Sequence, residues 1–235
     1  MRKLAQQTRN MKHFGVAVAN TRSVNSFTIN THGLSIEDKE YVRLSELEAF
    51  QIFGTEPEPL FDDLAEIVRI RFDTPMAFIS FVGRDTVHFK SKLGFDVPEV
   101  PREITFCDTT IASEDPLLIY DATTDDRFRL NPFVTGLPYV QFYAGAAIVT
   151  PKGEPIGVVC AVDTIPRSPC KSDVQFLKGV AKLAMNALEI RRQSQELLEL
   201  ANRFGTITNK MEAVRDELDE RCARTLARVM RHETI

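Results

Sequence analysis

The 235-residue sequence contains no tryptophan and no apolar run near the roughly 20 residues that cross a bilayer. It also lacks the leading apolar segment of an exported protein. Its 33 acidic residues outnumber its 29 basic ones, giving a formal net charge of −4, whereas a nucleic-acid surface needs a concentrated basic face. We therefore expect a cytoplasmic protein that neither inserts into a membrane nor binds nucleic acid.

Cysteine is also scarce, and its spacing is not that of a metal site. The four cysteines form no Cys-x-x-Cys pair and have no histidine at ligand spacing: Cys107, Cys160, Cys170 and Cys222. Reduced thiols in a cytoplasmic protein are typical of this pattern. We expect no disulfide framework and no metal site.

Residues 1–36 differ in composition from the rest of the chain. They contain five basic residues and no acidic one, are rich in Ser, Thr and Asn, and show no sustained periodicity. This composition predicts a flexible basic N-terminal tail. The alternative is an organellar transit segment, which is also basic and poor in acidic residues.

Two amphipathic helices are expected after the tail. Ser35 and Asp38 have the spacing of a capping box that begins the first helix. The second helix is expected from Pro59 to Phe72. The side chains expected to point inward from these two segments are Tyr41, Leu44, Leu47, Ile52, Leu60, Leu64, Ile67 and Val68.

The centre of the chain reads as strands. "MAFISFV" and "TVHFKSKLG" are joined by a Gly-Arg-Asp turn, "PLLIYDA" stands alone, and a second hairpin runs from Phe142 to Asp163 around Pro-Lys-Gly-Glu. Two hairpins around an isolated strand predict an antiparallel α+β sheet with helices packed on it.

The second hairpin does not alternate between apolar and polar residues, so both of its faces are expected to be covered. Its small residues, such as Ala146 and Ala161, are expected to leave space for a ligand on one face. We expect one of these two alanines to face a cavity and the other to face the helices, since strand alternation leaves the assignment open.

A long helix is expected from Ser172 onward. Apolar residues recur in it at alternating steps of three and four, which indicates a coiled-coil seam and hence a homodimer. The pattern passes Phe204 only if a step of three is inserted beside Gly205, which would make this point soft. Alternatively, the last helix folds back as a hairpin. The seam is expected to contain Val180, Leu183, Ala187, Ile190, Ser194, Leu197, Ala201, Phe204, Ile207, Met211, Val214, Leu218, Cys222, Leu226 and Val229.

A family resemblance is carried by "RLSELEAFQIFGTEPEPLFDDLAEIVRIRFDTPMAFISFVGRDTVHFKSKLGF", "PREITFCDTTI", "IYDATTDDRFRLNPFV" and "FYAGAAIVTPKGEPIGVVCAVDTIPR". In this order they resemble a bacterial GAF sensory domain of the kind that precedes histidine kinases and diguanylate cyclases. The resemblance covers residues 37–190 and leaves residues 191–235 as a coiled-coil or helical-hairpin output arm. It implies a six-stranded antiparallel sheet with helices on both faces and a ligand cavity beside the sheet.

Two positions depart from patterns of this family. His88-Phe89-Lys90 stands where Trp-Phe-Lys is typical, so an aromatic contact is replaced by a smaller titratable ring. In bilin-attaching relatives the attachment cysteine is usually followed by histidine, whereas Cys107 is followed by Asp108. We therefore expect no chromophore and no other cofactor, apart from a small-molecule ligand of unspecified chemistry.

The candidate ligand-binding residues are Phe106, Cys107, Asp121, Arg127, Phe128, Phe142, Tyr143, Ala146, Ala161 and His88. Arg127 can pair with a carboxylate or phosphate, with Asp121 positioning it. Alternatively, Asx turns and an Arg127–Asp ion pair only hold their own loop. Phe142 and Tyr143 point to opposite faces of the strand, so at most one of them can face the cavity.

We expect a noncatalytic sensor in which ligand occupancy is transmitted to an unidentified effector protein through a dimeric C-terminal helix. One alternative is a structural dimerisation or docking platform whose pocket is filled by its own side chains. A second, less favoured alternative is a small-molecule reductase in which Cys107 pairs with His88. His232 faintly resembles a phosphoacceptor histidine, but a solvated histidine at a helix end is the simpler interpretation.

Overall fold

A computed structural model describes residues 35–96 and 99–232, with side chains to residue 225. Most of the predicted N-terminal tail, and the side chains of Leu226, Val229 and His232, lie outside this range. Among the described residues, no helix is both long and apolar enough to cross a membrane.

Two helices begin the described chain, α1 (Ile36–Glu48) and α2 (Pro59–Phe72). The capping box at Ser35 and Asp38 is confirmed, so the first helix begins inside the segment that was assigned to the tail. The inward stripe of α2 is shifted from the expected one. Leu60 and Ile67 are 50% and 47% exposed.

Leu64 and Val68 are buried as expected, and they are joined by Phe61, Ala65 and Phe72. They follow the i, i+3, i+4, i+7 rule, centred on a face one residue further along the helix than predicted. In α1 the same correction applies to Tyr41, which is 68% exposed, while Leu44 and Leu47 are buried as expected.

A six-stranded sheet in the order β3-β2-β1-β6-β5-β4 forms the centre of the fold, and every neighbouring pair is antiparallel. Both predicted hairpins, β1–β2 and β5–β6, are confirmed. The strands are β1 (Met76–Val82), β2 (Thr86–Leu93), β3 (Glu99–Pro101), β4 (Leu117–Ile119), β5 (Phe142–Val149) and β6 (Pro155–Asp163).

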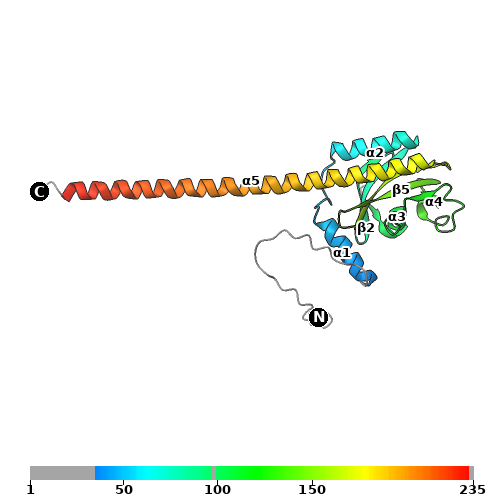
Figure 1. Cartoon of the computed structure of the whole chain (residues 1–235), viewed down its shortest axis with the longest axis horizontal. Coiled ribbons are helices and arrows are strands. Elements are labelled where there is room, and N and C mark those ends of the chain that lie inside the picture. The colour runs from blue at the N-terminus through cyan, green and yellow to red at the C-terminus, as the bar shows by residue number, and fades with distance from the viewer. Residues whose placement is uncertain (1–34, 97–98, 233–235) are drawn as a thin grey trace. The chain divides into compact units, whose positions relative to one another are not determined.

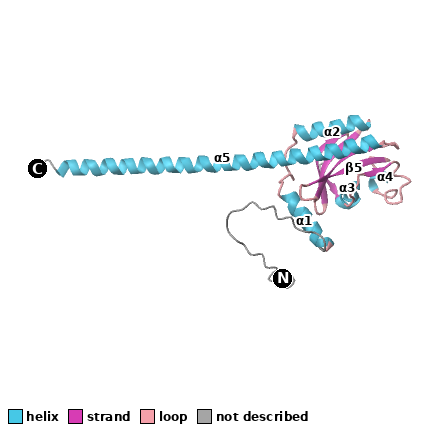
Figure 2. Ribbon diagram, in the orientation of Figure 1, coloured by secondary structure: helices cyan, strands magenta, loops and turns pink. Residues whose placement is uncertain are grey.

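Helices lie on both faces of this sheet, which confirms the predicted α+β class (Figure 1, Figure 2). On one face, α1, α2 and the first part of α5 (Lys171–His232) share a core with the sheet. On the other face, a second core contains the short helix α3 (Phe106–Ile111) and Val134 of α4 (Pro132–Thr135). We call these the helix face and the cavity face.

Ala146 and Ala161 both belong to the core of the helix face, which corrects the expectation that one of them faces the cavity. Their partners in the same core include Ala181 and Ala184 of α5, which packs on β5 and β6. Small side chains on both surfaces let the helix approach the sheet closely. Close packing therefore explains the small residues of this hairpin.

Replacing Ala146 or Ala161 by Leu should destabilise the fold in both cases, by about 1 to 3 kcal/mol, because both side chains are buried in the core of the helix face. Urea unfolding at equilibrium measures the effect. Ala147→Leu is the matched control, since Ala147 is only partly buried and points to the other face. An Ala146→Leu variant as stable as the Ala147→Leu variant would contradict the close packing of α5.

The helix α5 is continuous from Lys171 to His232, so the chain does not fold back at Gly205. Its residues from Leu177 to Leu188 contribute to the core of the helix face, and residues beyond Leu188 leave that core. The long helix is therefore both a structural part of the domain and an arm that extends from it.

Two residues of the predicted seam, Val180 and Ala187, are buried in the core of the helix face, which corrects the start of the seam. Six apolar residues of α5 recur every seven residues and are 54–69% exposed: Leu183, Ile190, Leu197, Phe204, Met211 and Leu218. From Leu197 onward, Leu200, Ile207 and Val214 complete the alternating steps of three and four, with Leu200 in place of Ala201. This alternative register needs no inserted step at Gly205. We call the nine residues the α5 seam.

Candidate functional site

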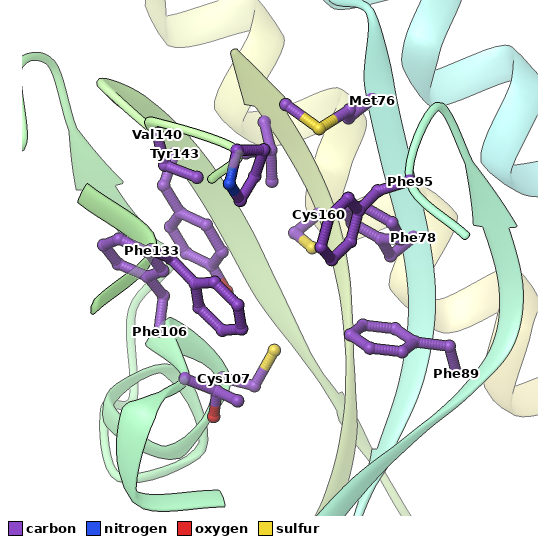
Figure 3. A pocket seen from close by; sticks show the side chains of 13 residues that line it. Met76, Phe78, Phe89, Phe95, Phe106, Cys107, Phe133, Val140, Tyr143 and Cys160 are labelled. Atoms are coloured by element: carbon purple, nitrogen blue, oxygen red, sulfur yellow. The ribbon is translucent and has the colours of Figure 1, made fainter. Parts of the chain in front are cut away.

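A small cavity lies on the cavity face, between the sheet and the segments that carry α3 and α4 (Figure 3). Its volume is about 50 Å³. Ligand pockets typically measure about 300 to 1,000 Å³, so side chains fill most of this space. The lining residues are Met76, Phe78, Phe89, Phe95, Thr105, Phe106, Cys107, Phe133, Pro138, Val140, Tyr143, Cys160 and Val162.

Aromatic rings dominate the wall of the cavity. Phe106 stacks on Tyr143 with ring centroids 4.9 Å apart, and Phe128 packs behind Phe106 at 4.7 Å. Phe78 and Phe89, from neighbouring strands, lie 5.1 Å apart. Rings arranged in this way present apolar surface against which a flat, apolar guest can pack.

The polar atoms near the cavity bond to one another. The hydroxyl of Tyr143 lies 2.8 Å from Thr110 Oγ1, and Cys107 Sγ lies 3.6 Å from Ser80 Oγ. Burial raises the pKa of Tyr143. The neighbouring Cys107 thiol, together with burial, raises the pKa of Cys160. The site therefore holds neutral groups and no fixed positive charge.

Gly145 does not open space above the sheet, contrary to the expectation for the small residues of this hairpin. A Cβ atom at Gly145 would clash with the hydroxyl and ring of Tyr143, which lies over this position. Glycine is therefore needed at position 145 so that the ring of Tyr143 can pack over the strand. The cavity arises from the arrangement of larger side chains around Tyr143.

Three of the ten candidate ligand-binding residues line the cavity: Phe106, Cys107 and Tyr143. Phe128 lies behind them in the same core. Phe142 belongs to the helix face, as expected if Tyr143 faces the cavity. Ala146 and Ala161 are also on the helix face, for the packing reason given above.

His88 does not meet Cys107. Its ring packs against Phe53, 5.6 Å between centroids, in the loop between α1 and α2. Its strand neighbours Val87 and Phe89 face the cavity side, and successive side chains of a strand alternate. The thiolate–imidazole pair considered for a reductase is therefore absent from the site.

The loop after β4 is held by its own bonds. Asp121 Oδ1 accepts hydrogen bonds from the backbone and hydroxyl of Thr123, and Asp125 accepts from the backbone of Arg127. The guanidinium of Arg127 also pairs with Asp125 at 2.7 Å. Neither Asp121 nor Arg127 lines the cavity, so this arrangement matches the structural interpretation of the loop.

The sequence did not predict most of the residues that line the cavity. Strand residues Met76, Phe78 and Cys160 share the face of Tyr143, which alternation would have indicated once the alanines had been assigned to the helices. Phe95 follows β2 and Phe133 belongs to α4, far apart in sequence, and their rings lie 6.3 Å apart. No local pattern brings these two rings together.

An ion network positions α3 beside the cavity. Arg102 donates to Asp108 of α3 at 2.6 Å and also pairs with Glu40 of α1. Arg43 donates to Glu40 at 2.6 Å and to the carbonyl of Val82 at 2.7 Å. Burial opposes ionisation of Glu40, but the two guanidinium groups prevail and lower its pKa from 4.5 to about 2.

Glu40→Gln should remove a pH-dependent part of the stability. Because the pKa of Glu40 falls from 4.5 to about 2 on folding, its contribution is present above 4.5 and is lost as the pH falls toward 2. After screening by solvent, we expect a difference of about 1 kcal/mol in unfolding free energy at neutral pH. Urea titrations at pH 7 and near pH 3 test this, and an equal difference at both would contradict it.

A wider groove borders the other end of β5. It has a volume of about 720 Å³ and lies between the β5–β6 turn, the α3–β4 loop and α5. Ala146 contributes to it, and an ion pair of 2.9 Å joins Lys178 and Asp115 on its rim. Its lining is of mixed charge, with Glu114, Asp115, Lys178 and Lys182, whereas the wall of the aromatic cavity holds no charged side chain.

Comparisons with known proteins bear on this arrangement. The model of the GAF domain family matches residues 56–188. A cyclic di-GMP phosphodiesterase of Pseudomonas aeruginosa is 31% identical over 163 residues, which is 69% of this chain and 28% of the relative. The chain thus spans less than a third of that relative's length.

Two solved structures are also similar in fold. One is the free methionine-R-sulfoxide reductase of Neisseria meningitidis, with 15% identity over 68% of this chain and 96% of that one, at a TM-score of 0.49. The other is the PixJ GAF domain of Thermosynechococcus elongatus, with 13% identity over 68% and 96% and a TM-score of 0.49. Within residues 35–96 and 99–225, no group of three or more His, Cys, Asp or Glu side chains is arranged to hold a metal ion.

Proposed function

Because the chain belongs to the GAF domain family, whose model matches more than half of it, we propose that it is a noncatalytic sensory and regulatory module. The observation that carries the proposal is α5. Its residues up to Leu188 pack in the domain core, and the same helix continues to His232 with the exposed α5 seam. A rigid helix shared by domain and arm is suited to passing a conformational bias outward.

The α5 seam is the proposed dimer interface. An isolated amphipathic helix gains most of its stability from burial of its apolar face, and the seam is uncovered in the single chain. The seven-residue repeat is that of a left-handed coiled coil, and the proposed dimer pairs its two helices in parallel. The two arms then form one output, which an effector protein reads.

The proposed ligand is small, uncharged and largely apolar or aromatic. The cavity wall is aromatic and aliphatic, with only hydroxyl and thiol groups as polar partners. Arg127, the cation first considered for an anionic ligand, is 54% exposed and already paired. A guest of more than a few atoms requires movement of the partly buried rings of Phe95 and Phe133.

The cavity volume supports a second candidate, the structural platform. A space of about 50 Å³ is smaller than the 150 Å³ of a known benzene-binding cavity, so a filled resting state is physically reasonable. In that case the chain dimerises and docks an effector without responding to a ligand. The reductase alternative has less support, because Cys107 lacks the imidazole partner.

Native mass spectrometry of the purified chain distinguishes the two candidates. If the chain is a sensor, we expect a small molecule to co-purify with it, or uncharged aromatic compounds such as indole or phenol to raise its melting temperature. A chain that carries nothing and responds to no compound in a broad metabolite screen would favour the platform.

A further inference from the structure

Lys90 is the extra residue of a β-bulge in β2. Ile79 of β1 lies opposite Ser91, and Ser80 lies opposite Phe89, which leaves Lys90 without a partner. Bulges commonly re-aim a side chain next to a functional site. Here, Phe89 lines the cavity (Figure 3), and the next residue reaches the helix face.

The side chain of Lys90 is enclosed on the helix face. It is 1% exposed and donates to Thr55 Oγ1 at 2.7 Å and to Glu58 Oε1 at 2.8 Å. The same oxygen of Glu58 accepts from Arg191 Nε at 2.8 Å. A buried ammonium requires a counter-charge, so Lys90 and Glu58 are held together firmly.

Arg191 lies where α5 leaves the domain. It stands three residues after Leu188, the last core residue of the helix, and six residues before Leu197 of the α5 seam. Its guanidinium also donates to the carbonyl of Phe50 at 2.9 Å, and its side chain is 11% exposed. Arg191 therefore anchors the base of the arm to the domain.

We propose that the Lys90–Glu58–Arg191 triad is a strut that couples the cavity to the base of the arm. Phe89 and Lys90 are consecutive residues, so a displacement of Phe89 by a guest shifts the anchor of Lys90. Because Glu58 is shared, the shift reaches Arg191 through two ionic hydrogen bonds. The proposal rests on the proposed sensory function and names the connection through which its signal passes.

A double-mutant cycle tests the strut without a ligand. Phe89→Ala empties part of the cavity wall, and Glu58→Gln breaks the charged link while keeping the side-chain length. Hydrogen exchange is measured by mass spectrometry in peptides covering residues 189–200 of the full-length chain. We expect Phe89→Ala to speed exchange there on the order of tenfold, a coupling typical of residues in one network, and to add nothing once Glu58→Gln is present.

Arg71→Gln is the matched control. It breaks another ion pair between α2 and α5, Arg71–Asp173 at 2.7 Å, near the start of α5 and away from the arm. In this background Phe89→Ala should retain its full effect. The strut is refuted if Phe89→Ala leaves residues 189–200 unchanged, or if it acts equally with Glu58 replaced.

Sedimentation of the same proteins measures whether they are dimers. It therefore distinguishes a failure of the strut from a failure of the proposed function. A wild-type dimer in which the effect of Phe89→Ala survives Glu58→Gln would contradict the strut alone. If Phe89→Ala prevents folding, Phe89→Leu takes its place in the cycle with the same expected outcomes.

Discussion

Replacing Leu197 and Phe204 together by Asp should convert a dimer into monomers. Both residues lie on the α5 seam, seven positions apart, and are 66% and 67% exposed in the single chain. In a coiled coil they would be buried against their counterparts. Each unpaired buried charge costs several kcal/mol, so we expect the dissociation constant to rise about a thousandfold or more. Analytical ultracentrifugation at micromolar concentration measures this.

The control variant places the same two Asp residues one position further along the helix. Leu198 is 65% exposed but lies off the α5 seam, as does Gly205, seven residues later. Leu198→Asp with Gly205→Asp should therefore remain dimeric. If both double variants dissociate equally, general charge on the helix and not the seam explains the loss. If the wild type already sediments as a monomer, dimeric transmission fails.

Cys160→Leu should abolish ligand binding while leaving the fold intact. Cys160 lines the cavity, and leucine adds two heavy atoms to a space of about 50 Å³. The added atoms compete directly with a guest, and substitutions that fill a cavity are commonly neutral or stabilising. We expect a nearly unchanged melting temperature and the loss of the thermal shift that indole or another uncharged aromatic compound produces in the wild type.

Ala161→Leu is the informative comparison, because Ala161 is the next residue and points to the helix face. The Ala161→Leu variant should be less stable than the wild type, yet a ligand should still raise its melting temperature. Equal destabilisation of both variants, with no compound shifting the wild type, would mean that the cavity is structural. The platform would then be the better description of the protein.

The fold could be predicted because its signals are local. The capping pair Ser35 and Asp38, and the turn between the strands of the Phe142–Asp163 hairpin, depend on residues within a few positions of one another. Antiparallel pairing then follows from the two hairpins. Such signals do not depend on the rest of the chain, which explains why they survive in the folded structure.

The cavity could not be predicted in the same way, because both faces of the central strands are buried. Every residue of β1 is buried, so alternation in hydrophobicity does not mark the cavity side. The small residues pointed to empty space, whereas Ala146 packs under α5 and Gly145 seats Tyr143. Only tertiary packing distinguishes a space that is filled from one that is open.

The seam was ambiguous for a different reason. Ala201 and Leu200 both fit between Leu197 and Phe204 with steps of three and four, and alanine is compatible with either a seam or its flank. The choice of Leu200 removes the inserted step at Gly205. The seven-residue recurrence from Leu183 to Leu218 was present in the sequence and would have indicated this register.

The distance between the two Cys222 side chains of a dimer tests parallel pairing through the α5 seam most directly. Cys222 is exposed and can carry a spin label once the other exposed cysteine is replaced, Cys170→Ser. A parallel dimer should give one interspin distance below about 25 Å, since paired helices lie about 10 Å apart. An antiparallel dimer centred on the seam would give about 65 Å at 1.5 Å per residue, and a monomer would give none. Either of the last two results would contradict transmission through two parallel arms.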